Sequence, residues 1–248
     1  MISQALERTL SKLIKISRNQ KIPFLLMGGI ATSVYAMPRA TFDIDAVIAI
    51  SREKFAQFLA QVEKDGFVYD QKKPLKTIGN FSFLTLYSKK DKIYVDIFLA
   101  EGAFQNGMVQ RAKEFKLGIK TVRIISPEDL VLLKLSHRNF KNEIPIPCCF
   151  LTKTNAGDKI GTDSDVTPVL ALRSKATGPG GKIVPCEARP ILQTGRERDL
   201  EDVRNIISEN AGSLDFKYLK KWAKELGLEV FLNDELRGLG VQKKLKYP

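Results

Sequence analysis

Two aspartates separated by one residue, Asp43 and Asp45, are the side chains in this sequence whose type and spacing most strongly suggest chemistry. They open an apolar run, and alternate residues of a β-strand point to the same side, so both carboxylates are expected on one face. Two carboxylates this close repel each other, and a divalent cation removes the repulsion. A simpler interpretation is that both side chains reach solvent at a strand start. The residues around the pair favour the cation.

A third aspartate and two glycines extend the pattern. Asp96 lies in a strand-like run at residues 93–99, where an unpaired carboxylate would be costly to bury. If this run pairs with the strand of Asp43, three carboxylates meet. Such oxygen donors suit Mg²⁺, with two ions expected when a triphosphate supplies further oxygens. Gly28 and Gly29 end an apolar run just before a short helix, and without side chains they let backbone amides approach a phosphate.

This set of residues resembles the nucleotidyltransferase superfamily with the polymerase-beta-like palm fold. The segments that carry the resemblance are Gly28-Gly29, Pro38-Arg39-Ala40-Thr41-x-Asp43-Ile44-Asp45 and Val95-Asp96-Ile97, followed by Arg111-Ala112, residues 126–130 with Lys134, and residues 195–202. Within the superfamily, the chain looks most like the AbiEii/MNT-type bacterial proteins, which often act as toxins in toxin–antitoxin pairs.

The resemblance implies transfer of a nucleoside monophosphate from an NTP to an acceptor, with release of pyrophosphate. It implies that Asp43, Asp45 and Asp96 hold Mg²⁺, and that Asp96 assists deprotonation of the acceptor hydroxyl. It also implies a cognate antitoxin as partner.

The same resemblance suggests which residues bind the nucleotide. Gly28 and Gly29 would contact the triphosphate, and Arg39 would neutralise phosphate or brace the carboxylates. The other residues expected at the nucleotide are Thr41, Lys134, Arg198 and Asp199. An equally weighted interpretation is that Asp199 and Asp202 cap or pair on a helix.

The composition limits the partners. The 248 residues carry a net charge of +12, and the sequence pI is about 9.5. Such a surface favours polyanions, which makes RNA, for example a tRNA end, a candidate acceptor beside a protein or a small molecule. Charge alone is equally consistent with a solvated surface that has no specific partner. No apolar run approaches the roughly 20 residues that a membrane span needs, and the first 20 residues read as an amphipathic helix rather than a signal peptide, so a cytoplasmic protein is predicted.

The carboxylates must be positioned by a sheet with helices around it. The pattern predicts strands at 24–27, 43–50, 81–87, 92–99 and 121–125, and helices at 1–20, 30–37, 52–62, from 126 onward, and at 197–209, 214–226 and 229–238. The expected fold class is α/β in the loose sense (α+β). A short mixed sheet flanked by helices would form a nucleotidyltransferase fold with a helical C-terminal region.

Residues 137–194 differ from the rest of the sequence in composition and pattern: they are rich in proline and glycine and show no sustained hydrophobic periodicity. The predicted organisation is therefore a nucleotidyltransferase core at 1–136, a loop-like, poorly ordered insertion at 137–194, and a helical region at 195–248. The alternative is that the insertion is a functional recognition loop. A zinc site of its three cysteines with His137 is disfavoured, because the cysteines lack C-x-x-C spacing. The insertion separates Lys134 from Arg198, so activity depends on whether these two parts still pack together.

Two other functions compete with the enzyme. A non-catalytic nucleotide- or partner-binding module could retain the fold; the three carboxylates argue against it, and the insertion argues for it. The apolar stripe of the helix at 214–226 could bind a membrane surface, but such a stripe far more often packs on its own domain.

Overall fold

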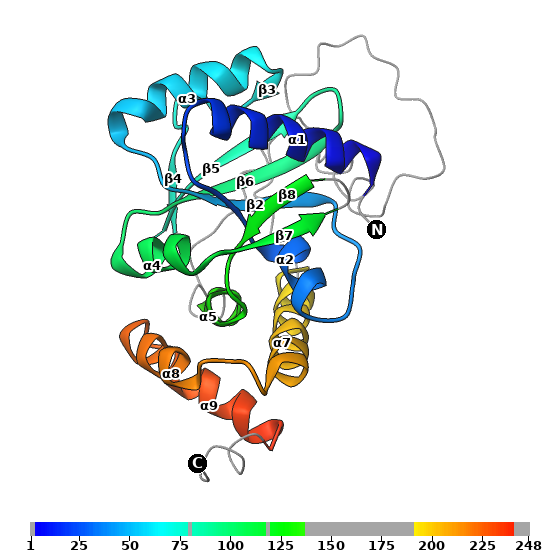
Figure 1. Ribbon diagram of the computed structural model, residues 1–248, viewed down its shortest axis with the longest axis vertical. Helices are drawn as coiled ribbons and strands as arrows, with labels where there is room; N and C mark the ends of the chain where they lie inside the picture. Colours follow the sequence, from blue (N-terminus) through cyan, green and yellow to red (C-terminus); the bar gives the residue numbers. More distant parts are fainter. Residues whose placement is uncertain (1–2, 79–80, 118–119, 137–190, 241–248) are drawn as a thin grey trace, which may run out of the picture. The chain divides into compact units, whose positions relative to one another are not determined.

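The computed structural model describes residues 3–78, 81–117, 120–136 and 191–240, without the side chains of Ile78 and residues 191–196. Its helices are α1 (Gln4–Asn19), α2 (Gly28–Tyr35), α3 (Arg52–Lys64), α4 (Ala103–Arg111), α5 (Pro127–Ser136), α7 (Ile191–Asn210), α8 (Phe216–Glu225) and α9 (Glu229–Gly238) (Figure 1). The strands are β1 (Phe24–Leu26), β2 (Asp43–Ile48), β3 (Phe67–Val68), β4 (Lys76–Ile78), β5 (Phe81–Ser88), β6 (Ile93–Leu99), β7 (Lys113–Leu117) and β8 (Lys120–Ile124).

All of these strands belong to one mixed sheet. Their order is β3-β5-β6-β2-β1-β8-β7, with β4 paired to β5. At its centre, β2 runs parallel to β6 and antiparallel to β1, and β1 runs parallel to β8. The predicted mixed α/β class is therefore confirmed. The sequence patterns missed α4 and the peripheral strands β3, β4 and β7, of which β3 and β4 are only two and three residues long.

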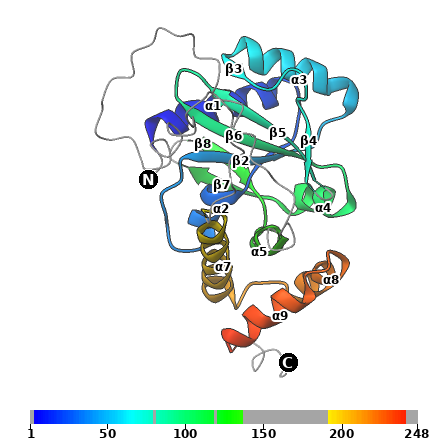
Figure 2. The same ribbon diagram turned by 180° about the vertical axis from the view of Figure 1, so that it is seen from behind.

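The two faces of the central strands differ in how deeply their side chains are buried. Along β6 the side chains of Ile93, Val95, Ile97 and Leu99 are buried, whereas the alternate residues are exposed or half-buried. Helix α1 contacts β2, β6 and α3, and its inward side chains lie at helical spacing at Leu6, Leu10 and Leu13. Figure 1 shows α1 crossing in front of the strands, and Figure 2 shows it behind them. The carboxylates of the central strands are therefore on the side opposite the buried residues.

The predicted helical C-terminal region is present as α7, α8 and α9. Val203, Ile206 and Ile207 of α7 are buried, and the Asn210 amide donates to the carbonyl of Tyr35 on α2 over 2.7 Å. The described residues before 137 and from 195 onward belong to one compact unit, so the segments on either side of the predicted insertion pack together. Most of that insertion, with its three cysteines and His137, lies outside the described residues. That this segment is poorly ordered, and that a zinc site of its cysteines with His137 is disfavoured, therefore stay predictions.

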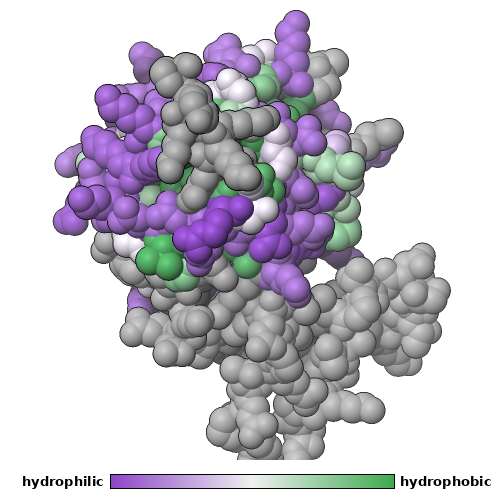
Figure 3. All heavy atoms as spheres, turned by 90° about the horizontal axis from the view of Figure 1, so that it is seen from below, coloured by the Kyte–Doolittle hydropathy of each residue, from purple (hydrophilic) through white to green (hydrophobic). Residues whose placement is uncertain are grey.

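The apolar side of α8 packs within the same unit. Leu219 and Ala223 are fully buried, and the Trp222 ring centroid lies 5.2 Å from that of Phe104 on α4. This packing favours a structural role for the stripe over membrane-surface binding. Among the described helices none is both long enough and apolar enough to cross a bilayer. Seen from below, the described surface is mainly hydrophilic, and its hydrophobic residues form small, separate patches (Figure 3).

Candidate active site

One cavity brings together nearly all the residues that the sequence singles out. It has a volume of about 290 Å³ and lies where α2, β2 and the segment between them meet α5 and α7. Nine predicted site residues line it: Gly28, Gly29, Arg39, Thr41, Asp43, Asp45, Lys134, Arg198 and Asp199. The tenth, Asp96, does not line the cavity, but it is the register partner of Asp45 on the neighbouring strand β6.

The glycine pair sits where helix and strand approach most closely. Gly28 begins α2 with a φ of +59°, a conformation that L side chains rarely adopt. A Cβ on Gly28 would lie 1.8 Å from the Asp45 Oδ2 atom, and a Cβ on Gly29 would lie 2.6 Å from the Thr41 hydroxyl. A side chain at either position would therefore displace Asp45 or Thr41. The first N–H groups of an α-helix have no acceptor inside the helix, so the start of α2 presents an anion-binding helix terminus to the cavity.

Strand register assembles the three carboxylates. Asp43 and Asp45 project from the same side of β2, and Asp45 lies directly beside Asp96 across the parallel β2–β6 pair. The Thr41 hydroxyl donates to Asp43 Oδ1 over 2.6 Å, and the Thr85 hydroxyl donates to Asp96 Oδ1 over 2.7 Å. Sequence reasoning missed Thr85, which becomes visible only through the β5–β6 pairing.

The electrostatic environment of Asp96 follows from this arrangement. Burial raises the pKa of its carboxyl above the ordinary value, and the charge of Asp43 raises it further. The Thr85 hydroxyl and the Lys76 ammonium act in the opposite direction but do not cancel the shift. Asp96 therefore holds a proton more readily than an exposed aspartate does.

The carboxylates do not form a preformed metal cage. Among the residues that the structure describes, no three His, Cys, Asp or Glu side chains form a group that could hold a metal ion as they stand. The donor chemistry suits Mg²⁺, and the register places the three aspartates on one patch of the sheet. Joint coordination requires their side chains to turn toward a common point.

The opposite side of the cavity is built from cations paired with α7. The Lys134 Nζ atom lies 2.9 Å from Asp199 Oδ1 and 2.7 Å from Asp202 Oδ2, and the Arg39 guanidinium lies 3.1 Å from the same Asp202 oxygen. Asp199 and Asp202 thus pair with cations of α5 and of the loop before β2. Asp202 was not predicted as a site residue. The sequence feature that could have indicated Asp202 is its position three residues after Asp199, which places both side chains on the same side of a helix.

We expect Asp202→Ala to destabilise the protein more than the replacement of an exposed carboxylate by alanine does. The side chains of Asp202 and Lys134 are only 6% and 5% exposed, so the change leaves a buried ammonium with one partner fewer. The expected loss is about 3 kcal/mol of unfolding free energy, measured by urea denaturation. Asp234→Ala is the matched control, because Asp234 is 54% exposed and lies 3.8 Å from Arg237 in a surface pair worth about 0–1 kcal/mol. Equal losses in the two variants would contradict a structural role for the Asp202 contacts.

The cavity also has an apolar wall that the sequence did not reveal. It consists of Met27, Phe42, Phe98, Leu130 and Leu133. Phe42 is 76% exposed, although it directly precedes the strand that carries the aspartates. These side chains come from four separate segments, and only the tertiary structure places them around one space. An apolar wall beside a helix terminus can take a planar ring linked to phosphates.

Comparison with known proteins adds weak structural likenesses. No family model and no curated protein matches the chain. Among solved structures, ANT(2'')-Ia in complex with adenylyl-2''-tobramycin shares 17% identity with a TM-score of 0.41, covering 56% of this chain and 77% of its own. The lincosamide antibiotic adenylyltransferase LnuA, bound to lincomycin, shares 18% identity at a TM-score of 0.38, covering 53% and 85%. JHP933 from Helicobacter pylori shares 16% identity at a TM-score of 0.34, covering 98% and 97%. Likenesses of this strength do not decide an activity, so the function of this chain must be argued from its own residues.

Proposed function

We propose that this protein is a Mg²⁺-dependent nucleotidyltransferase of the polymerase-beta-like superfamily, which transfers a nucleoside monophosphate from an NTP to an acceptor. The observation that carries the proposal is the in-register pairing of Asp45 with Asp96 beside a helix that begins at two glycines packed against Asp45 and Thr41. Carboxylates and a helix N-terminus within one cavity are what a metal-bound triphosphate requires.

In this proposal Asp43, Asp45 and Asp96 hold two Mg²⁺ ions. Metal bound there would stabilise the attacking and leaving oxygens of an in-line phosphoryl displacement. The proposal rests on the donor set and on the shared strand face, and it requires the side-chain rotations described above.

The remaining roles belong to residues around the cavity. The α2 terminus at Gly28 and Gly29 binds the triphosphate, with Arg39 balancing its charge. An acceptor hydroxyl attacks the α-phosphorus, the bond to the bridging oxygen breaks, and pyrophosphate leaves. Asp96 takes the hydroxyl proton at Oδ2, because its Oδ1 accepts from the Thr85 hydroxyl.

Lys134, Arg198 and Asp199 are proposed to line the nucleotide pocket, together with Thr41. Lys134 is already paired with two aspartates, so its proposed contribution is to hold α7 against the cavity as well as to meet phosphate. The toxin role of the AbiEii/MNT type and a cognate antitoxin are proposed from the resemblance alone, and the cytoplasmic location is proposed from the sequence features given above.

The test is transfer of label from each α-labelled NTP to total RNA, protein or small molecules of a lysate. We expect Mg²⁺-dependent labelling of one fraction with one preferred NTP, abolished by EDTA. The alternative, a non-catalytic binding module, predicts Mg²⁺-dependent NTP binding by calorimetry without turnover. Failure to bind any NTP in the presence of Mg²⁺ would contradict both.

A further inference from the structure

A pair of tyrosines lies on the same side of the sheet as the carboxylates. The ring centroids of Tyr87 on β5 and Tyr94 on β6 are 4.7 Å apart, and Tyr94 is 47% exposed. Tyr94 is the register partner of Asp43, and it precedes Asp96 by two residues on the same side of β6. Two residues of a strand span about 7 Å. The rings are therefore roughly one nucleotide step from the aspartates.

The carboxylates have aromatic rings on both sides along β6. Phe98 follows Asp96 by two residues, lines the nucleotide cavity, and stacks on Phe83 of β5 with centroids 5.6 Å apart. Asp96 thus lies between Phe98, which lines the cavity, and a tyrosine pair that does not. None of the nucleotide-binding roles proposed above uses the tyrosines.

Three lysines lie in the turn that joins the two strands of the tyrosine pair. The turn between β5 and β6 carries Lys89, Lys90 and Lys92, all exposed. The turn is held in place by Asp91, whose side chain is 1% exposed and lies 2.8 Å from the Arg8 guanidinium of α1. These contacts fix the backbone of the turn, so the three lysines are held at the end of the two strands that carry Tyr87 and Tyr94.

We propose that Tyr87, Tyr94 and the three lysines form the binding platform for an unpaired nucleic-acid strand that is the acceptor of the transfer, an inference that rests on the proposed function. Stacking on aromatic faces combined with cations along the backbone is how proteins hold single strands irrespective of sequence. A strand whose last base stacks on Tyr94 has its terminal hydroxyl within reach of Asp96.

Fluorescence anisotropy with the full-length protein and labelled 12-nucleotide strands, in RNA and DNA forms and as duplexes, tests the platform. Wild-type protein is expected to bind single strands more tightly than duplex. Tyr94→Ala should weaken single-strand binding about 10-fold, and Tyr94→Phe, which keeps the ring, should stay within about twofold. Replacing Lys89 and Lys90 by alanine should reduce the slope of log affinity against log salt by about one to two.

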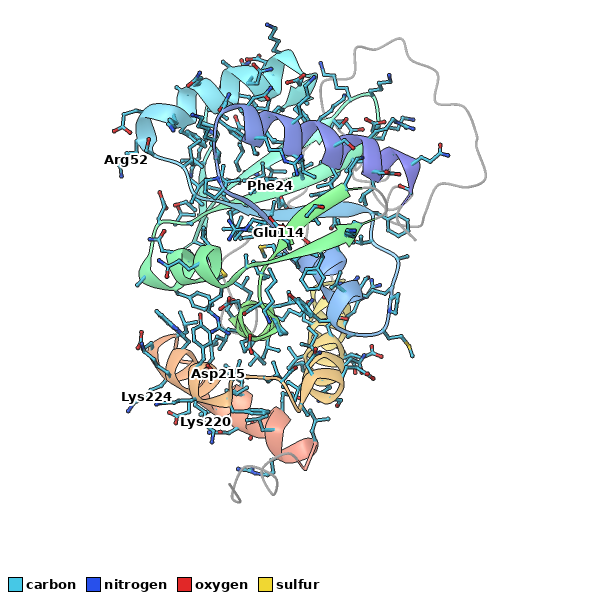
Figure 4. All side chains as sticks on the ribbon, viewed as in Figure 1. Phe24, Arg52, Glu114, Asp215, Lys220 and Lys224 are labelled. Atoms are coloured by element: carbon cyan, nitrogen blue, oxygen red, sulfur yellow. The ribbon has the colours of Figure 1, made fainter. Side chains whose placement is uncertain are left out.

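A matched charge control comes from α8, where Lys220 and Lys224 are exposed (Figure 4). The variant with both replaced by alanine loses the same net charge, and it should bind single strands as wild type does. Equal effects of the two double-lysine variants, or wild-type binding by Tyr94→Ala, would overturn the platform. Preference for RNA over DNA identifies the acceptor strand as RNA, and the reverse identifies it as DNA.

The platform and the proposed function can be refuted by different experimental results. Asp43→Asn should bind strands normally, because binding needs no transfer. Strand binding without any NTP turnover by wild type would refute the enzyme and, with it, the acceptor role. Turnover that labels only protein or small molecules, with no strand binding, would refute the platform alone.

Discussion

Gly28→Ala is expected to reduce nucleotide transfer about 100-fold or more while leaving the protein folded. The added Cβ would lie 1.8 Å from Asp45 Oδ2, so the carboxylate has to move away from its place beside Asp96. Displacement of a catalytic group by about 1 Å is enough for a loss of this size. The positive φ at Gly28 adds a backbone penalty of about 1–2 kcal/mol for an L side chain. Steady-state transfer assays and urea denaturation measure the two effects.

Gly212→Ala is the matched control for this substitution. No atom lies within 4 Å of a Cβ built at Gly212, which is exposed in the turn after α7. Activity should be unchanged there. Gly28→Ala with near-normal activity would show that the contact between α2 and β2 does not position the reacting groups, and it would contradict the proposed triphosphate site.

Asp43→Asn is expected to abolish transfer without lowering stability in metal-free buffer at neutral pH. The amide oxygen can still accept from the Thr41 hydroxyl, but the side chain no longer carries a charge for Mg²⁺. Its negative charge is also one cause of the raised pKa of Asp96, so removing it relieves a repulsion within the folded protein. The loss in transfer should exceed about 1,000-fold, as expected when an essential metal ligand is lost.

The pH dependence of this stability difference has a definite sign. A carboxyl whose pKa is higher in the folded chain than in the unfolded chain destabilises the fold once the pH rises above its unfolded value. Relief of that penalty at Asp96 should therefore appear at pH 7 and vanish below about pH 4, where aspartates are protonated in both states. Denaturation at the two pH values measures it, with Asp234→Asn on α9 as an exposed control. An Asp43→Asn protein that is markedly less stable than wild type at pH 7 would contradict the repulsion, and one that remains active would contradict the metal assignment.

Much of the central fold was predictable because its signals are local. The alternation in β6 and the helical spacing of Leu6, Leu10 and Leu13 each reflect a period that a short window of sequence contains. The strand β3 has only two residues, too few to show a repeating pattern. In β7, at the edge of the sheet, half-buried and exposed side chains alternate too weakly to indicate a strand. The contacts of Asp202 were also beyond prediction, because its partners precede it by 68 and 163 residues. Pairing over such separations depends on how α7 packs, which no local pattern encodes.

Local sequence patterns were enough to indicate the types and spacing of the candidate site residues: two aspartates on one side of a strand, a third aspartate in another strand, and glycines where a helix begins. That β2 and β6 are parallel neighbours, with Asp45 beside Asp96, could be known only from the folded chain. The same holds for the Gly28 backbone, which lies against the Asp45 carboxylate, and for the tyrosine pair on the side of the sheet that carries the aspartates. Side-chain direction within an element follows from backbone periodicity, whereas adjacency between elements follows from the burial of the whole core.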